Sequence, residues 1–297
     1  MPRAVPRGGA RQLSPLVRVD ALRVAFEISV DEPAVERELQ FLVHSAVQGE
    51  EPRALVHYGV SRAGDIYEIR REGVLMNVEI ELRMVLQDLH TRLHREALAA
   101  WPSGVALRAL TGGFRGERFV LTGESLPDRS RIGLELLSCG FDVEGDYMAI
   151  AHDQGVTAFP RPLRIPDPHV PLPRNAPPRT ELPCNGSCWA LDLGRAGIDW
   201  RIHTGPVQYV ILLEANYGGQ TRLYEVGGRE AAQVLMSHAY ALGTPVDAIR
   251  TVARLVDRSS CYRLRLGAVD EITSVWPSHA RAAPGRHGAL KSPFCPV

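Results

Sequence analysis

The sequence has almost no lysine: the single one, Lys291, stands close to the C-terminus, and arginine supplies the rest of the positive charge. Lysine is the usual clamp for phosphates held in a glycine-rich loop, and it is the amine of Schiff-base enzymes. The body of the chain offers no lysine for either role. A mechanism that depends on lysine is therefore not expected.

Net charge is also absent, because 34 basic residues balance 34 acidic residues. A neutral chain has no broad electrostatic attraction to nucleic acid or to an anionic membrane, so we expect neither as a partner. No run of about 18 apolar residues is present, which argues against a membrane-spanning helix. Residues 1–15 contain arginines but no apolar stretch behind them, so no secretory signal is predicted and we expect a cytoplasmic protein.

Cysteine is scarce, and the odd count of five argues against a disulfide framework. Cys184 and Cys188 have a C-x3-C spacing, but no second ligand pair with a comparable spacing completes a zinc site. His90 and His94 are four residues apart, but Thr91 occupies the position where a metalloprotease carries glutamate. We predict no metal and no cofactor, and we expect the two histidines on a solvated helix face.

The first predicted domain is a small α/β unit over residues 16–100. An alternating strand at 22–30 precedes a helix at 33–47, which begins with a proline suited to a first helical turn. Apolar residues recur at steps of three and four after Ile80, which predicts a long amphipathic helix. Between these helices, strands are predicted at 53–60, 65–72 and 74–79, the first two as a hairpin.

The second predicted domain covers residues 101–276 and is followed by a loose tail at 277–297. Strands are predicted at 104–110, 117–123, 147–160 (with a turn), 207–214, 221–226 and 261–267, and helices after residue 125 and at 229–242, 246–256 and 269–276. Proline is dense at 159–183, which excludes a helix and is compatible with either a disordered loop or an ordered arm. The predicted class of the whole chain is α/β.

A loop that resembles a phosphate-binding loop follows the strand at 117–123 and reads Gly123–Glu124–Ser125–Leu126–Pro127–Asp128–Arg129–Ser130. A phosphate-binding loop has the pattern G-x-x-x-x-G-K-[ST], so Gly123 and Ser130 match while Asp128 and Arg129 replace the second glycine and the lysine. Pro127 has no N–H to offer a phosphate. A carboxylate at about 4 Å from a phosphate charge costs roughly 4 kcal/mol at an effective dielectric near 20. The octet therefore predicts a degenerate loop that does not bind ATP.

The surrounding sequence resembles the HPr kinase/phosphorylase-like family, which includes the HPr-kinase-related proteins of peptide-modification gene clusters. The stretch LRALTGGFRGERFVLTGESLPDRSRIGLELLSCGFDVEGDYMAI keeps the family's order of strand, glycine-rich turn, loop, helix, Gly-Phe pair and acidic position, and FPRPLRIP resembles its Pro-Arg-Pro segment. The resemblance is strongest over 104–166 and extends over 55–276. It implies a kinase core of the PEP-carboxykinase-like type that is often oligomeric, so we expect a homodimer.

Departures from the family fall at the positions that carry its chemistry. Arg108 stands where the family has a histidine, Asp146 keeps the first acidic position, and Tyr147 replaces the second. Phosphoryl transfer depends on positioning and on charge neutralisation by Mg²⁺ and a basic side chain, so this set implies a kinase fold without kinase chemistry. Asp142 and Glu144 alternate with Asp146, which is compatible with paired acid–base carboxylates or with a polar loop that enters a strand.

These observations favour a non-catalytic module that binds a peptide or protein. By the resemblance, its partner is a precursor peptide in a pathway for ribosomal peptide natural products (RiPPs), of the crocagin type. The alternatives are an ATP-dependent kinase with an atypical loop and a regulatory pseudokinase subunit of an active homologue. The hairpin at 53–72 is expected to leave a free strand edge for an extended peptide, with Tyr67, Ile69, Arg70 and Arg71 beside it.

Overall fold

The computed structural model describes residues 16–39, 42–43, 46–48, 51–123, 126–165, 180–181, 189–191, 193–194 and 197–276. Its contacts divide the chain into two compact units, Met1–Val43 with Pro52–Arg95, and His44–Glu51 with Glu96–Val297. The sequence placed this boundary after residue 100 and gave 44–51 to the first domain. The tail at 277–297, Cys184, Cys188 and most of the proline-dense segment lie outside the described residues.

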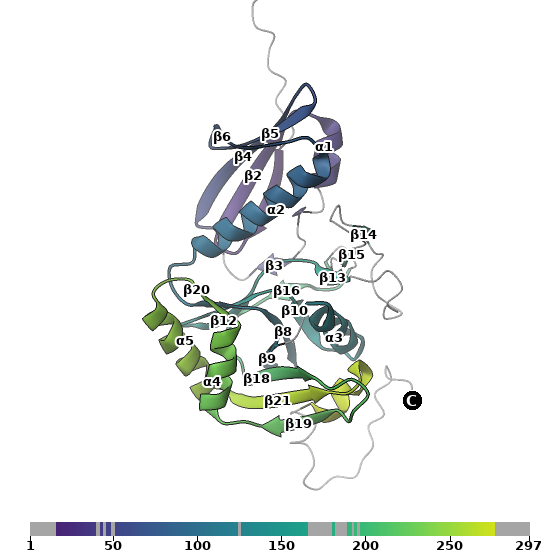
Figure 1. The fold of residues 1–297 in the computed structure, drawn as a ribbon, viewed down its shortest axis with the longest axis vertical. Coiled ribbons are helices and arrows are strands. Elements are labelled where there is room, and N and C mark those ends of the chain that lie inside the picture. Colours follow the sequence, from purple (N-terminus) through teal and green to yellow (C-terminus); the bar gives the residue numbers. More distant parts are fainter. Residues whose placement is uncertain are drawn as a thin grey trace, which may run out of the picture. The chain divides into compact units, whose positions relative to one another are not determined.

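The first unit is built on one five-stranded sheet with the order β1-β2-β4-β5-β6 (Figure 1). β2 and β4 run parallel, and the other neighbours are antiparallel. The strands are β1 (Leu16–Ala21), β2 (Val24–Val30), β4 (Ala54–Ala63), β5 (Ile66–Arg71) and β6 (Val74–Glu79), and the helices are α1 (Pro33–Leu39) and α2 (Leu82–Ala99). The predicted hairpin, the third strand after it and the long helix are confirmed.

One face of this sheet is buried because side chains alternate along each strand. Phe26, Ile28 and Val30 on β2 are at most 1% exposed, and α2 crosses the sheet in Figure 1. The buried positions of α2 recur every three or four residues, namely Val85, Leu86, Leu89 and Leu93. His94 of α2 is also buried and its ring lies 3.8 Å from that of His90, so the expectation of a solvated histidine pair was wrong for His94.

The predicted helix at 33–47 is wrong at its C-terminal end, where the described residues 42–43 and 46–47 are not α-helical. α1 ends at Leu39, and Val47–Gln48 form the short strand β3, which pairs in parallel with β16 (Arg201–Ile202) of the second unit. Val47 also donates its backbone N–H to the Trp200 carbonyl at 2.9 Å. A two-residue strand whose partner lies about 150 residues away leaves no local pattern in the sequence.

The second unit contains two larger sheets, a six-stranded one with the order β10-β8-β9-β18-β21-β19 and a five-stranded one with the order β17-β12-β11-β7-β20. The strands of the first are β8 (Ala109–Phe114), β9 (Glu117–Gly123), β10 (Asp142–Gly145), β18 (Tyr209–Ala215), β19 (Arg222–Glu225) and β21 (Ser260–Leu266). Those of the second are β7 (Val105–Leu107), β11 (Ala149–His152), β12 (Gly155–Ala158), β17 (Thr204–Gly205) and β20 (Ala239–Ala241). A third, small sheet has the order β13-β15-β14, with β13 (Leu163–Ile165), β14 (Thr180–Glu181) and β15 (Trp189–Leu191).

Helices flank the six-stranded sheet on both faces (Figure 1). They are α3 (Leu126–Ser138), α4 (Gly228–Ser237) and α5 (Pro245–Asp257), and a 3₁₀ helix covers Val269–Val275. The predicted helix at 229–242 ends early, because residues 239–241 pair with β7 as β20 instead. No described helix combines the length and apolarity needed to cross a membrane.

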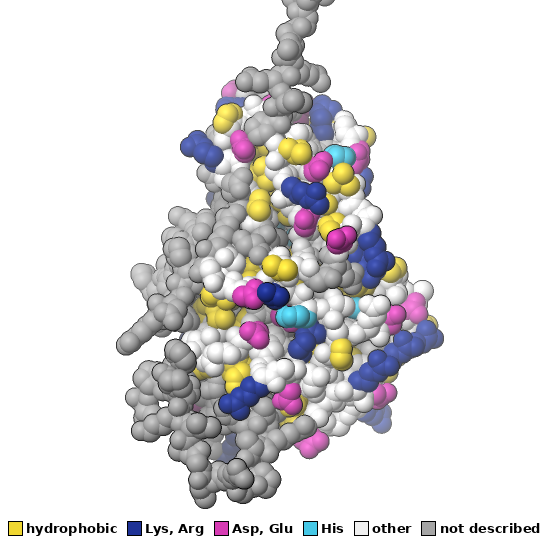
Figure 2. All heavy atoms as spheres, turned by 180° about the vertical axis from the view of Figure 1, so that it is seen from behind, with side chains coloured by type: hydrophobic (Ala, Val, Ile, Leu, Met, Phe, Trp, Pro, Cys, Tyr) yellow, Lys and Arg dark blue, Asp and Glu magenta, His cyan; other side chains and the backbone are white. Residues whose placement is uncertain are grey.

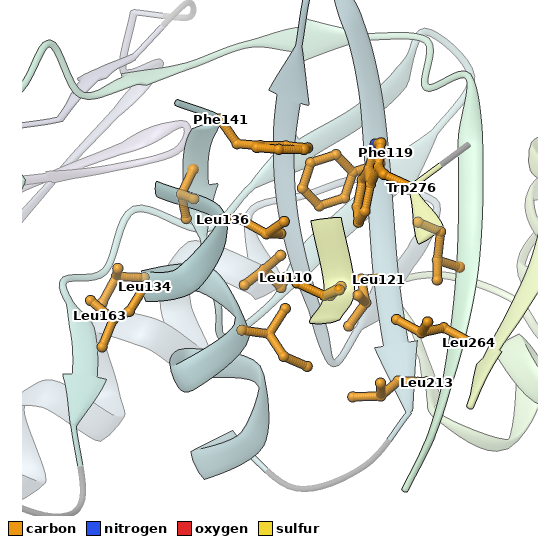
Figure 3. Packing of buried hydrophobic residues seen from close by; sticks show 14 of the residues in the cluster. Leu110, Phe119, Leu121, Leu134, Leu136, Phe141, Leu163, Leu213, Leu264 and Trp276 are labelled. Atoms are coloured by element: carbon orange, nitrogen blue, oxygen red, sulfur yellow. The ribbon is translucent and has the colours of Figure 1, made fainter. Parts of the chain in front are cut away.

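The alternation of β9 and β18 divides the interior of this unit into two cores. Phe119 and Leu121 of β9 pack with α3 and Trp276, whereas Val120 between them packs with α4 and α5. Figure 3 shows the first core, in which the rings of Phe119, Phe141 and Trp276 meet. The Phe119 and Trp276 centroids are 4.7 Å apart at 76°, an edge-to-face arrangement. Parallel strands β9, β18 and β21 with helices on both faces confirm the α/β class.

Candidate functional site

The degenerate loop lies between β9 and α3, at the end of a central parallel strand. Gly123 is the last residue of β9 and has φ +110°, a backbone conformation that favours glycine. A Cβ at Gly123 would lie 2.4 Å from the carbonyl oxygen of Leu213, so the close approach of β9 to β18 also requires glycine here. Pro127 and Asp128 follow in the first turn of α3. This is the position at which a helix N-terminus can face an anion.

The side chains of Arg129 and Ser130 turn into the protein. Arg129 is only 3% exposed, and it donates from Nη1 to the Gly123 carbonyl at 2.8 Å and from Nε to the Asp146 carbonyl at 3.3 Å. Ser130 is fully buried and donates its hydroxyl to Oδ2 of Asp146. The residues at the lysine and serine positions of a phosphate loop are therefore committed to contacts within the protein.

Asp146 is the centre of this buried network. Its Oδ1 accepts from Nη2 of Arg161 at 3.2 Å, and its Oδ2 also accepts from the backbone N–H of Arg164 at 3.4 Å. Arg161 is 2% exposed and lies over the ring of Tyr147, 3.8 Å from its centroid. Burial lowers the pKa of Arg161 to about 10, although the charge of Asp146 opposes this shift.

The network has a consequence for phosphoryl transfer. A kinase would aim its hydroxyl, basic side chain and carboxylate at phosphate and Mg²⁺, but here Ser130, Arg129 and Asp146 contact each other or nearby backbone groups. Within the described part of the chain, no group of three or more histidine, cysteine or acidic side chains is arranged to hold a metal ion. What remains is a scaffold stabilised by internal charge pairing.

A cavity of about 860 Å³ opens beside this network and is contained in the second unit. Its walls bring together four residues singled out from the sequence, Arg108, Gly123, Arg129 and Tyr147. Ser130 and Asp146 are buried in the adjoining network rather than in the cavity wall. The other lining residues are Leu98, Ala106, Met148, Leu213, Val234, His238, Tyr240 and Leu242.

Arg108 and Tyr240 are the exposed residues of the cavity wall. Arg108 lies between β7 and β8, its Nη2 donates to the Tyr240 hydroxyl, and its Cζ is 5.4 Å from the centre of that ring. Both side chains are exposed. Tyr240 and His238 could not be placed here from the sequence, because the local pattern predicted a helix that continues to residue 242.

The alternating carboxylates do not form an acid–base pair. Glu144 is 1% exposed and is bound by Arg118 through two contacts, Nε to Oε1 at 3.0 Å and Nη2 to Oε2 at 2.8 Å. Asp146 instead pairs with Arg161, and Asp142 is exposed. The strand register shifts between Val143 and Gly145, so the strict alternation assumed from the sequence is broken. Both buried carboxylates have arginine partners and serve as structural ion pairs.

The predicted free edge of the hairpin is in the wrong place. β5 carries Tyr67, Ile69, Arg70 and Arg71, and it pairs with β4 on one side and β6 on the other. Ile69 is fully buried, and Arg70 contacts Glu68 at 2.7 Å. The extra strand β6 covers the edge at which the sequence placed a peptide.

The open edge of this sheet is β6 itself. Among the described residues, no strand pairs with its outer side. Four of its six residues are large apolar side chains that are 41–62% exposed, namely Val74, Leu75, Met76 and Val78. Leu75 is opposite Arg70 and Val78 is opposite Glu68, which places both on one face of the sheet. An exposed apolar edge of this kind is a template for pairing with another strand.

Comparisons with protein-family models and with curated proteins found no match to this sequence. Two features of the structure bear on function: the buried network with its cavity, and the open edge of β6.

Proposed function

We propose that this protein is a non-catalytic module that binds an extended polypeptide, with the β6 edge as the binding surface. The observation that carries the proposal is the row of exposed apolar side chains on an unpaired edge strand. A peptide that adds to such an edge gains backbone hydrogen bonds, and its alternate side chains contact one face of the sheet. The opposite edge strand, β1, is a poorer surface because Val17, Val19 and Ala21 are buried.

The absence of catalysis in this proposal rests on the buried network. Freeing Arg129, Ser130 and Asp146 for a nucleotide would break the hydrogen bonds that the Asp146 carboxylate accepts and those that the buried arginines donate. Breaking one buried ion pair costs about 3–5 kcal/mol. An ATP-dependent kinase with an atypical loop, or a regulatory pseudokinase subunit of an active homologue, would have to overcome that cost.

The identity of the partner rests on the resemblance to HPr-kinase-related proteins of peptide-modification clusters. On that basis we propose a degenerate HPr-kinase-like (PEP-carboxykinase-like) core that no longer transfers phosphate, and a precursor peptide of a RiPP pathway, of the crocagin type, as the partner. A family that acts on polypeptides can keep a polypeptide-binding surface after losing its chemistry. We further propose that the protein works as a homodimer in the cytoplasm.

Peptide binding can be measured by fluorescence anisotropy with the full chain and the labelled product of each short open reading frame found beside its gene. We expect the double variant Leu75→Lys/Val78→Lys to weaken binding at least tenfold, because charges on an edge strand oppose strand addition. The matched control is Val246→Lys/Ile249→Lys, which changes two exposed apolar side chains of α5 in the second unit. Equal loss in both variants, or none in either, would contradict binding at β6.

Nucleotide binding is tested separately by isothermal titration with Mg²⁺·ATP. We expect no measurable heat of binding. A dissociation constant in the low micromolar range would favour the kinase or the pseudokinase alternative. The double variant Asp128→Gly/Arg129→Lys shows whether the scaffold alone can accept a nucleotide once the loop sequence is restored.

A further inference from the structure

We infer that the cavity beside the degenerate loop binds a carboxylate group carried by an apolar or aromatic body. This inference goes beyond the proposed function, because the cavity belongs to the second unit and β6 belongs to the first. Binding of a carboxylate in the cavity does not depend on the addition of a peptide to the sheet edge. Three properties of the wall carry it: its charge, its apolar surface and the geometry of Arg108.

The charge of the wall is positive. Arg108 and Arg129 line the cavity, and none of the lining residues is acidic. Among the described residues of the network behind the wall, Asp146 supplies one negative charge, and Arg129 and Arg161 supply two positive charges. A low local dielectric strengthens the attraction of such a charge for an anion. An anionic group in the cavity is therefore favoured over a neutral or cationic one.

Arg108 is the group that can contact this anion directly. Its guanidinium is exposed, and among the described residues its polar contact is with the Tyr240 hydroxyl rather than with a carboxylate. Arg129, by contrast, is buried with two of its nitrogens on backbone carbonyls, so it contributes charge more than contact. The planar fork of an arginine matches the two oxygens of a carboxylate.

The rest of the wall suits an apolar body. Leu98, Met148, Val234 and Leu242 supply aliphatic surface, and the rings of Tyr147 and Tyr240 supply aromatic surface. A volume of about 860 Å³ lies within the range of pockets that bury a drug-sized ligand, roughly 300–1,000 Å³. An aromatic or branched aliphatic group of one or two amino-acid residues fits within this volume.

A phosphate group fits the same site less well. Pro127 offers no N–H at the start of α3, and Asp128 adds a like charge in the same turn. A dianion meets twice the repulsion that a singly charged carboxylate meets. The single contact group Arg108 is sufficient for a carboxylate, whereas phosphate sites gather several N–H donors or a metal ion.

The test uses N-acetyl-L-phenylalanine and its uncharged amide as probes, with isothermal titration on the full chain. We expect the acid to bind with a Kd below about 1 mM and the amide at least tenfold more weakly, as the loss of one charge-assisted contact implies. Arg108→Gln should weaken the acid about tenfold and leave the amide unchanged. The control Arg222→Gln, an exposed arginine on β19, should leave both unchanged.

Equal affinities for acid and amide, or full affinity of the acid for Arg108→Gln, would overturn the inference. A second variant, Leu242→Trp, fills the cavity from a half-buried position and should abolish binding of the acid, with circular dichroism to verify the fold. N-acetyl-Leu-Phe identifies the source of the carboxylate. Tighter binding of this dipeptide than of the single residue indicates a polypeptide C-terminus, and equal binding indicates a free small acid.

Discussion

The carboxylate of Asp146 balances the charge of Arg161 in a place that water does not reach. We expect Asp146→Asn to destabilise the second unit by about 3–5 kcal/mol, because Arg161 would remain buried without a counter-charge. Urea unfolding followed by tryptophan fluorescence reports on this unit alone, since Trp101, Trp189, Trp200 and Trp276 all belong to it.

The control for this variant is Asp199→Asn, which removes an exposed carboxylate paired with Arg201. Its effect should stay within about 0.5 kcal/mol. The double variant Asp146→Leu/Arg161→Met should recover much of the lost stability, because it removes both buried charges. If the double variant is no more stable than Asp146→Asn, the ion pair is not the source of the effect.

The thiol of Cys261 gives the second unit an alkaline dependence of stability. Burial, helped by the charge of Asp257, raises the pKa of Cys261 from 9.0 to about 11. Between these values the folded thiol keeps a proton that the unfolded thiol loses, so its contribution is complete below pH 9 and is lost as pH rises through 11. We expect the stability advantage of the wild type over Cys261→Ala to shrink by up to about 2 kcal/mol from pH 8 to pH 11.

Urea unfolding of both proteins at several pH values, under reducing conditions, measures this difference. Comparing wild type with variant cancels the contributions of every other titrating group. A difference that stays constant from pH 8 to pH 11 would contradict the assignment.

At the scale of elements, the position of the sheet edge decides where a proline is tolerated. Ile69→Pro removes an N–H from the interior strand β5 and replaces a fully buried side chain, so we expect a loss of about 3 kcal/mol or more in the first unit. Val78→Pro on the edge strand β6 should cost much less. Hydrogen exchange of the β4 and β5 amides measures both.

Comparable loss of protection in the two proline variants would mean that β6 is not an edge. A proline at Tyr67 or Ile69 would test peptide addition only if β5 were the free edge. The structure moves that test to β6, since a proline on β5 would unfold the sheet before it could report on binding.

The elements that could be predicted are those with a local signal. The spacing of Val85, Leu86, Leu89 and Leu93 indicated α2, and the turn chemistry around Gly64 indicated the hairpin of β4 and β5. β3 and β20 could not be predicted, because two or three residues became strands only through pairing with distant partners. Both lie where the local pattern favoured the continuation of a helix.

The candidate site divides in the same way. The family resemblance and the octet at 123–130 predicted which positions along the chain belong to the site, namely Arg108, Arg129, Asp146 and Tyr147. Their contacts were not, because the partner of Asp146 at Arg161 and the partner of Arg108 at Tyr240 depend on the packing of separate elements. A sequence shows which groups are missing from a phosphate loop, but not that the remaining ones bind each other.

At the scale of the whole molecule, the neutral surface charge bears on self-association. Charged side chains of both signs are interspersed on the face shown in Figure 2, and the sequence pI is near 7.2. Such a surface neither drives nor opposes the formation of a homodimer. We expect light scattering at micromolar concentration to give twice the chain mass of 32.7 kDa.

A specific dimer should keep that mass at pH 6 and pH 8, on either side of the neutral point. Association caused only by low net charge should instead peak near pH 7 and give a range of larger masses. A monomer mass at pH 6, pH 7 and pH 8 would contradict the homodimer.

The short strand β3 also sets an order of events while the chain is being synthesised. The chain leaves the first unit after Val43, contributes β3 to the second unit and returns at Pro52, yet the partner strand β16 is made about 150 residues after β3. At roughly 5–20 residues per second, β3 waits about 10–30 s for that partner. The first unit is complete in sequence by Arg95. Its core can therefore form before β16, the pairing partner of β3, has left the ribosome.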